Sequence, residues 1–235
     1  MTFVIENEFG SIEYFDNDEE MVKQKPFGLI FEQNFVLSFL KEYVVSSSVI
    51  LDVGAHCGSH TLLYKRINPD VEVYAFEPQA AMYSLLVNNV KSNNLLKVHC
   101  YNNAVGDCIG DMQMNNYSED GINAFERVFY DDENLFNLAG LSIGSGGETV
   151  KMVTIDSLKI ECDFIKIDVE GYEINVIQGA IETIKNCKPV ICYENNHKGS
   201  AHFDAISGIL QDVGYSIRYA DIDNWIATPI LTEVV

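Results

Sequence analysis

The sequence has few basic residues and no long apolar runs. Lysine and arginine together number 15, against 35 aspartates and glutamates, and the formal net charge is −20. Contacts to nucleic-acid phosphates depend on lysine and arginine, so we expect no nucleic-acid partner. No apolar run approaches the roughly 20 residues of a membrane span, and the first residues do not form a signal segment. We therefore expect no membrane association and a cytoplasmic location.

Cysteine pairs of the C-x-x-C kind are also missing. The six cysteines are scattered, and several lie inside apolar runs, which indicates free thiols in a reducing compartment rather than disulfides or zinc ligands. No proline-rich or glycine-rich linker divides the 235 residues. We interpret residues 46–235 as one domain, long enough for a sizeable hydrophobic core, and residues 1–45 as an N-terminal cap segment.

Short β-rich runs alternate with helical patterns from residue 49 onward. The predicted strands cover residues 49–53, 71–76, 97–102, 163–167, 189–193, 215–220 and 225–230. Apolar residues recur at helical spacing over 78–91, 172–186 and 203–213. Such alternation predicts an α/β fold with a mostly parallel sheet.

Two connections in this pattern carry further information. Only four residues, Asp221 to Asn224, separate the last two predicted strands. A parallel crossover needs a dozen or more residues, so the C-terminal strand should be reversed. Residues 115–149 fit no element and are rich in loop-forming residues, and we interpret them as a lid insertion.

The most informative segment is a buried strand that runs into a glycine loop and then a helix, at residues 49–61. Asp52, Gly54 and Gly58 have the spacing D-x-G-x-x-x-G, and Ser59 stands where a third glycine would be. A nicotinamide site typically has G-x-G-x-x-G. The observed spacing therefore disfavours NAD, although a nucleotide-binding loop remains the simplest interpretation.

An acidic residue at the end of the next strand identifies the ligand more closely. Glu77 lies 25 residues after Asp52, where it can accept hydrogen bonds from two ribose hydroxyls. This favours S-adenosylmethionine. Its carboxylate would use the free N–H groups at the start of the helix and the hydroxyls of Ser59 and Thr61.

Four motifs together resemble the FkbM-type methyltransferases over roughly residues 48–195. They are Asp52-Val53-Gly54-Ala55 with Gly58, Phe76-Glu77-Pro78, Asn103-Ala104-Val105-Gly106-Asp107, and the run from Asp163 to Glu173. The resemblance implies a Rossmann-like class I enzyme that uses S-adenosylmethionine and methylates hydroxyls of sugars, glycans or small metabolites. It also implies a cofactor pocket lined by Asp52, Gly54, Gly58, Glu77, Asn103 and Ala104, with the last two near the adenine. His56, in the same loop, is also expected to bind the cofactor, although it stands where members commonly have a small or amide residue.

Polar residues follow two predicted strands that should be neighbours. Asp168 comes after strand 163–167, and Glu194 and Asn195 come after strand 189–193. Ligands gather at the carboxyl ends of the strands in open α/β sheets, so these side chains should converge. Hard oxygen ligands suit Mg²⁺ or Mn²⁺. We therefore expect a divalent-cation site formed by Asp168, Glu194 and Asn195.

Other roles for this region stay open. In a metal-free enzyme, Glu170 or His197 would be the general base. Lys166 lies within an apolar strand and needs a partner, so it is a further catalytic candidate. A further alternative is that Asp168 holds no metal and either binds the cofactor or caps the next helix. On the first helix, His60 is expected to pack or to contact the cofactor.

Two other functions are compatible with parts of the pattern. One is an NAD-dependent oxidoreductase, which the missing third glycine disfavours. The other is a cofactor-binding scaffold without catalysis, which the polar clusters after the two strands disfavour. Phe27, Phe31, Phe35 and Phe39 recur every four residues, and core packing or a homodimer contact explains them.

Overall fold

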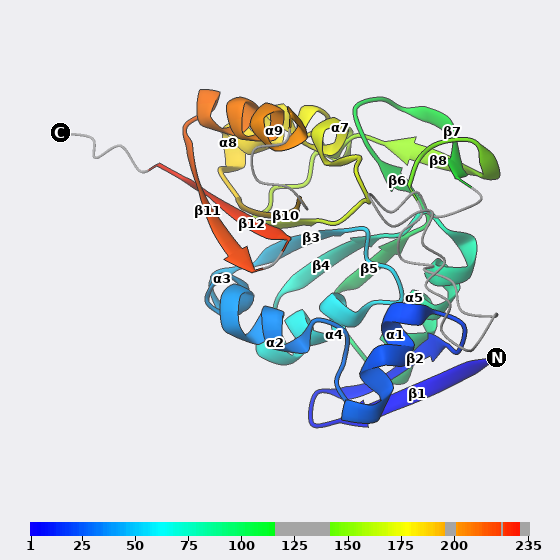
Figure 1. Cartoon of the computed structure of the whole chain (residues 1–235). Coiled ribbons are helices and arrows are strands. Elements are labelled where there is room, and N and C mark those ends of the chain that lie inside the picture. The colour runs from blue at the N-terminus through cyan, green and yellow to red at the C-terminus, as the bar shows by residue number, and fades with distance from the viewer. Residues whose placement is uncertain (116–141, 196–200, 222, 231–235) are drawn as a thin grey trace.

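A seven-stranded sheet with helices on both faces forms the centre of the molecule (Figure 1). The computed structural model describes residues 1–115, 142–195, 201–221 and 223–230. In spatial order the strands are β11 (Tyr215–Asp221), β12 (Asn224–Pro229), β10 (Val190–Glu194), β9 (Phe164–Ile167), β3 (Val49–Val53), β4 (Glu72–Phe76) and β5 (Val98–Tyr101). β12 is antiparallel to both of its neighbours, and the other adjacent pairs are parallel. The predicted strands and the reversed C-terminal strand are confirmed.

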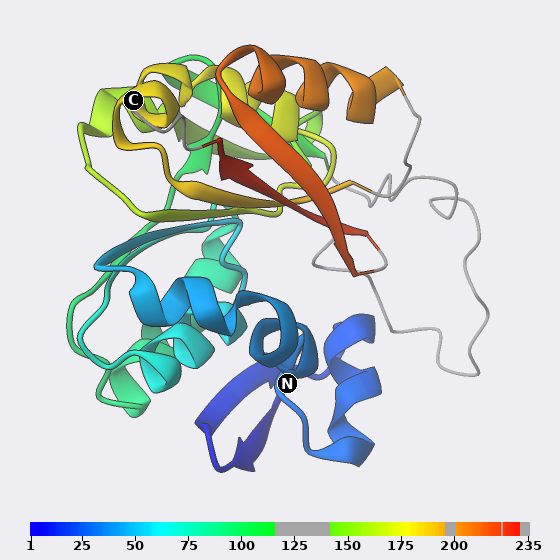
Figure 2. The same cartoon turned by 90° about the vertical axis from the view of Figure 1, so that its left-hand side faces the viewer.

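Helices cover both faces of this sheet (Figure 2). One face carries α4 (Ser59–Ile67) and α5 (Ala80–Ser92), and the other carries α7 (Glu173–Gln178), α8 (Ile181–Cys187) and α9 (Ala201–Asp212). Adjacent strand residues point to opposite faces, so Ile50 enters the first core and Leu51 the second. Among the described residues, no helix has the length and apolar composition needed to cross a membrane.

The helix predicted over 172–186 is instead two short helices, α7 and α8. The break falls at Gly179 and Ala180. A Cβ atom at Gly179 would lie 1.9 Å from the carbonyl oxygen of Gly106. The chain therefore breaks the helix where its backbone packs directly against the loop after β6. The other two predicted helices are confirmed as α5 and α9.

A small second sheet follows β5. It consists of β6 (Ala104–Val105), β7 (Gly110–Asn115) and β8 (Gly146–Val153), and α6 (Ile155–Leu158) follows it. β8 begins inside the segment predicted to fit no element, so that prediction is wrong for its last residues. Val150 and Met152 are buried whereas Lys151 is exposed, as in a half-buried strand, but the glycines at its start hide the pattern. Residues 116–141 lie outside the described residues, and their role as a lid stays a prediction.

The N-terminal segment, residues 1–45, packs on the same face as α4 and α5. Its elements are β1 (Thr2–Asn7), β2 (Gly10–Phe15), α1 (Glu19–Gln24), η1 (Lys25–Phe27), α2 (Gln33–Phe35), η2 (Val36–Leu40) and the start of α3 (Lys41–Ser46). Ile12, Ile30 and Val36 are buried in the core of that face. The segment is therefore anchored to the sheet by apolar packing. The four recurring phenylalanines do not share one helix: Phe27 is exposed, and Phe35 packs on Phe39.

Candidate active site

The loop after β3 requires glycine at its first position. Gly54 has a φ of 81°, and a Cβ atom there would lie 1.7 Å from the carbonyl oxygen of Asp168. The amides of Gly54 and Ala55 both donate to the carbonyl oxygen of Phe76, at 3.0 and 2.9 Å. The loop is thus held between the ends of β4 and β9. Gly58, with a φ of 93°, ends the loop where α4 begins.

Glu77 lies at the end of β4 and is almost completely buried, with 3% of its surface exposed. Its carboxylate accepts hydrogen bonds from the amides of His56 (2.9 Å) and Gln79 (2.8 Å). Burial raises the pKa of Glu77 to about 7, although both amides and the charge of His56 oppose that shift. Small changes around neutral pH therefore change the charge of this carboxylate.

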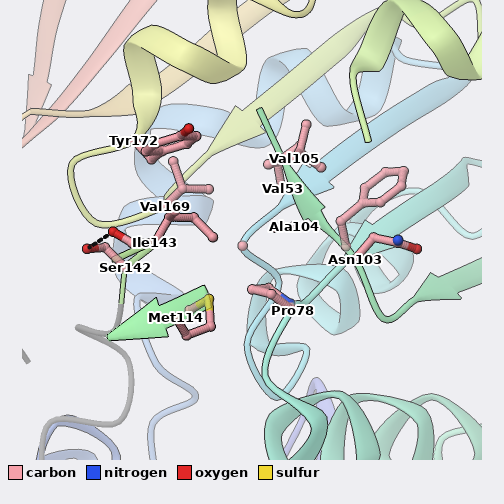
Figure 3. A pocket seen from close by; sticks show the side chains of 12 residues that line it. Val53, Pro78, Asn103, Ala104, Val105, Met114, Ser142, Ile143, Val169 and Tyr172 are labelled. Carbon is pink, nitrogen blue, oxygen red and sulfur yellow. Dashed lines mark hydrogen bonds between the residues drawn. The ribbon is translucent and has the colours of Figure 1, made fainter. Parts of the chain in front are cut away.

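An apolar pocket of about 330 Å³, which includes space continuous with solvent, lies beside the glycine loop (Figure 3). This is at the lower end of the range of roughly 300–1,000 Å³ for small-molecule sites. Its lining residues are Val53, Gly54, Phe76, Pro78, Asn103, Ala104, Val105, Met114, Ser142, Ile143, Val169 and Tyr172. Figure 3 shows Met114, Val169 and Tyr172 on one side and Pro78 and Asn103 on the other. A flat, weakly polar ring such as adenine suits such a pocket.

Sequence motifs predicted part of this pocket. Gly54, Asn103 and Ala104, which the sequence analysis assigned to the cofactor pocket, line it. Met114 and Tyr172 line it too, and the sequence analysis gave them no role. Met114 comes from β7, which had no strand signal. Tyr172 lies in the run from Asp163 to Glu173, where the neighbouring carboxylates were the stronger signal.

The polar residues at the start of α4 bind to other parts of the protein. The Thr61 hydroxyl donates to the carboxylate of Asp52, a residue with 1% of its surface exposed. Burial raises the pKa of Asp52, and the Thr61 bond opposes the shift. The Ser59 hydroxyl lies 3.1 Å from the Tyr14 hydroxyl of the N-terminal segment. A cofactor would have to share these two hydroxyls, so their cofactor role stays a prediction.

His56 also faces the N-terminal segment. It has a left-handed backbone, with a φ of 51°. Its Nε2 atom lies 3.2 Å from a carboxylate oxygen of Asp18, which is buried. Burial disfavours the charged imidazole, but Cys57 and Asp18 outweigh burial and raise the pKa of His56 well above its ordinary value. The backbone amide of His56, bound to Glu77, is the part nearest the predicted ribose site.

Four charged residues converge at the ends of β9 and β10. We call Lys166, Asp168, Glu170 and Glu194 the charged cluster. Lys166 is buried, and its Nζ atom lies 3.1 Å from Asp168 Oδ2. One carboxylate oxygen from each acidic member lies within 4.8 Å of the other two. The structure thus brings together Asp168 and Glu194, as their positions after neighbouring strands predicted, and it gives the buried Lys166 a partner in Asp168.

The cluster balances its charges internally. Burial disfavours a charged Lys166, but Asp168 outweighs burial and raises the pKa of Lys166. Burial likewise disfavours a charged Asp168, but Lys166 and a bond to Glu194 lower its pKa. Burial and the neighbouring Asp168 raise the pKa of Glu194 well above its ordinary value. These shifts favour an ionised Asp168 paired with Lys166, and they favour the neutral form of Glu194 more than in an ordinary carboxyl group.

Hydrogen bonds to the Glu173 side chain hold the loop between β9 and α7. Glu170 has a φ of 54°. Glu173 is buried and accepts hydrogen bonds from the amides of Gly171 (3.0 Å) and Val169 (3.4 Å). These bonds hold the backbone on both sides of Glu170.

The remaining predicted residues lie just beyond β10. Asn195 is buried. Its backbone N–H donates to the backbone carbonyl of Asp223 (2.6 Å), and its backbone carbonyl accepts from the Trp225 indole (3.2 Å). His197 lies outside the described residues. The roles of Asn195 as a metal ligand and of His197 as a base stay predictions.

The strand order, the glycine loop and the acid at the end of β4 define a Rossmann-like methyltransferase fold. The family model of the methyltransferase FkbM domain matches residues 52–217. Because this match covers more than half of the chain, the protein belongs to the FkbM methyltransferase domain family.

Solved structures of methyltransferases share this fold. The chain is similar to a methyltransferase FkbM from Methylobacillus flagellatus KT, at 18% identity and a TM-score of 0.53, over 77% of this chain and 43% of that one. It thus spans less than half the length of that relative. It is also similar to a SAM-dependent O-methyltransferase from Thermotoga maritima, at 10% identity and a TM-score of 0.50, over 98% of this chain and 78% of that one. No protein of curated function matches the sequence.

Proposed function

We propose that the protein transfers a methyl group from S-adenosylmethionine to a hydroxyl of a sugar, a glycan or another small metabolite. The observation that carries the donor assignment is the buried Glu77 beside the apolar pocket and the glycine loop. The carboxylate suits the ribose hydroxyls, and the pocket suits the adenine. The sulfonium methyl group would then lie towards the ends of β9 and β10.

The ribose role of Glu77 makes the affinity for the cofactor depend on pH. Only the ionised carboxylate accepts from both hydroxyls, so lowering the pH through about 7 protonates Glu77 and weakens S-adenosylhomocysteine binding by up to ~10-fold per pH unit. We expect Glu77→Gln to lose ~10–100-fold in affinity, from charged hydrogen bonds of about 1.5–3 kcal/mol, and to lose this pH dependence. Isothermal titration calorimetry measures both.

Glu72→Gln is the matched control, because Glu72 begins the same strand and pairs with His99 at the surface. It should bind S-adenosylhomocysteine as the wild type does. An unchanged affinity in Glu77→Gln would reject the ribose assignment.

The charged cluster supports a hydroxyl acceptor. A hydroxyl is a poor nucleophile until its proton is removed or polarised. Carboxylates at the ends of β9 and β10 are the groups that bind such a hydroxyl and direct it at the methyl carbon. Orientation of this kind lowers barriers by ~7–11 kcal/mol. Glu170 and His197 are the candidates for the base from the sequence.

An acceptor screen tests the reaction. The protein is incubated with S-adenosylmethionine that carries a ¹³C-methyl group and a panel of sugars, sugar nucleotides and polyols. Mass spectrometry and NMR then locate the label. Label on oxygen supports the proposal, whereas label on nitrogen or carbon would refute the hydroxyl assignment.

A divalent cation is the second part of the proposal. Asp168, Glu194 and Asn195 would hold Mg²⁺ or Mn²⁺, and Glu170 lies close enough to Asp168 and Glu194 to join them. Oxygen donors fit such an ion, although the ammonium group of Lys166 already neutralises Asp168. A bound ion would lower the pKa of the acceptor hydroxyl as a Lewis acid.

Removing metal separates the two versions of the mechanism. We expect EDTA treatment followed by desalting to lower turnover at least ~10-fold, and Mg²⁺ or Mn²⁺ to restore it, because the metal supplies charge stabilisation worth several kcal/mol. The calorimetric affinity for S-adenosylhomocysteine should not change. Full turnover in EDTA would reject the metal and leave the metal-free mechanism.

A further inference from the structure

The N-terminal segment places a carboxylate at the active-site edge of the sheet. Glu32 lies at the start of α2, and its Oε2 atom is 2.9 Å from Nε2 of His60 in the first turn of α4. The His60 side chain keeps 9% of its surface exposed, and the Glu32 side chain keeps 24%. Glu32 precedes the residues that match the FkbM domain.

The pair borders the ends of β3 and β9. Asp52 on β3 is the register partner of Lys166 on β9, so these two side chains share one face of the sheet. In its protonated form, His60 would lower the pKa values of Asp52 and Asp168, which burial otherwise raises. Ligands of open α/β sheets bind outside these strand ends, and the electrostatic influence of His60 on Asp168 indicates that His60 lies near the charged cluster.

The backbone of Glu32 is strained but well supported. Its φ and ψ of 53° and 19° are left-handed, which costs a residue with a Cβ atom ~1–2 kcal/mol. On one side, the Phe31 amide donates to the Tyr14 hydroxyl (3.1 Å). On the other, the Gln33 side chain accepts from Asn7 (2.8 Å). Strain of this kind persists when the surrounding structure fixes the conformation, and it clusters at functional sites.

The charge state of Glu32 determines which nitrogen of the His60 imidazole carries the proton. Burial alone would raise the pKa of Glu32, but the bond to His60 and the nearby charges of His60 and Lys166 lower it. An ionised carboxylate next to Nε2 favours the tautomer with its proton on Nε2. The Nδ1 atom then carries a lone pair. A carboxylate that orients an imidazole in this way is the arrangement that supports a general base.

We propose that His60 is the general base that removes the proton from the acceptor hydroxyl, and that Glu32 is its positioning residue. The proposal rests on the proposed hydroxyl methylation. As the acceptor oxygen bonds to the methyl carbon, the carbon–sulfur bond breaks and its electron pair stays on sulfur. The hydroxyl proton moves to Nδ1 of His60, Glu32 stabilises the resulting imidazolium, and the sulfonium becomes the neutral thioether.

Three variants of the full chain test this assignment, with kcat and KM measured against pH on an acceptor from the ¹³C-methyl screen. We expect His60→Gln to lose ~10²–10⁴-fold in kcat and to lose the acidic limb of the kcat profile. Glu32→Gln should lose ~10–10³-fold, and Glu32→Asp should recover part of that. Affinity for S-adenosylhomocysteine should stay within ~3-fold, because the proposed donor contacts come from Glu77 and the apolar pocket. The charged or titratable groups that influence this pair are Asp52, Tyr64, Lys166 and Asp168.

Asp18→Asn is the matched control, because Asp18 and His56 form a second carboxylate–imidazole pair between the N-terminal segment and the glycine loop. It should lower stability as Glu32→Gln does but keep the acidic limb. If Glu32→Gln and His60→Gln also keep that limb and most of kcat, the pair only anchors the segment and the proposal is wrong. If the wild type methylates no hydroxyl in the screen, the proposed function fails first.

Discussion

Asp168→Asn should reduce turnover at least ~100-fold and lower the free energy of unfolding by about 3–5 kcal/mol. The substitution removes the negative charge 3.1 Å from the buried Lys166 ammonium and leaves that charge unpaired. It also removes the carboxylate charge that, after burial, does most to raise the pKa of Glu194. Urea unfolding measures the stability change, and methyl transfer at saturating donor measures turnover.

A double variant separates stability from chemistry. Asp168→Asn combined with Lys166→Met removes both charges, so stability should largely recover while turnover stays low. Glu182→Gln is the control for the loss of one acidic partner, because Glu182 and Lys185 form an exposed pair, and exposed pairs contribute only ~0–1 kcal/mol. Near-normal turnover in a folded Asp168→Asn variant would contradict a central role for the charged cluster.

Gly54→Ala should abolish donor binding and destabilise the fold. The left-handed backbone alone costs alanine ~1–2 kcal/mol. The new Cβ would also lie 1.7 Å from the carbonyl oxygen of Asp168, so β3 and β9 must separate. We expect a total loss above ~2 kcal/mol and no calorimetric signal with S-adenosylhomocysteine.

Gly208→Ala provides the opposite case. Gly208 lies inside α9, and nothing is within 4 Å of a Cβ atom placed there. Alanine should therefore stabilise the protein by roughly 0.5–1 kcal/mol and leave donor binding unchanged. If Gly54→Ala behaves like Gly208→Ala, the close contact between the loop and β9 is not required.

The central sheet was predictable because its middle strands are nearly all apolar and are separated by clear helical patterns. The break between α7 and α8 was not, because the periodicity of Ile174, Ile177, Ile181 and Ile184 continues across it. Only the contact of Gly179 with Gly106 explains the break. β8 was hidden because glycines begin it and because its antiparallel partner, β7, is far away in sequence.

The donor side of the site was more predictable than the acceptor side. Gly54 and Gly58 occupy positions where the backbone conformation permits few other residue types. Glu77 occupies a position where the proposed ribose contact permits few others. The contact of Glu32 with His60 joins residues 28 positions apart in the chain, and no local pattern around Glu32 indicates it. Long-range contacts of this kind need the tertiary structure.

The most direct test of the account is calorimetric titration of the protein with S-adenosylhomocysteine and, separately, with NAD⁺. We predict saturable binding of S-adenosylhomocysteine at one site, together with a stability gain of ~2.7 kcal/mol at a ligand concentration of 100 Kd, and no binding of NAD⁺. Binding of NAD⁺ without binding of S-adenosylhomocysteine would contradict the assignment of the methyl donor.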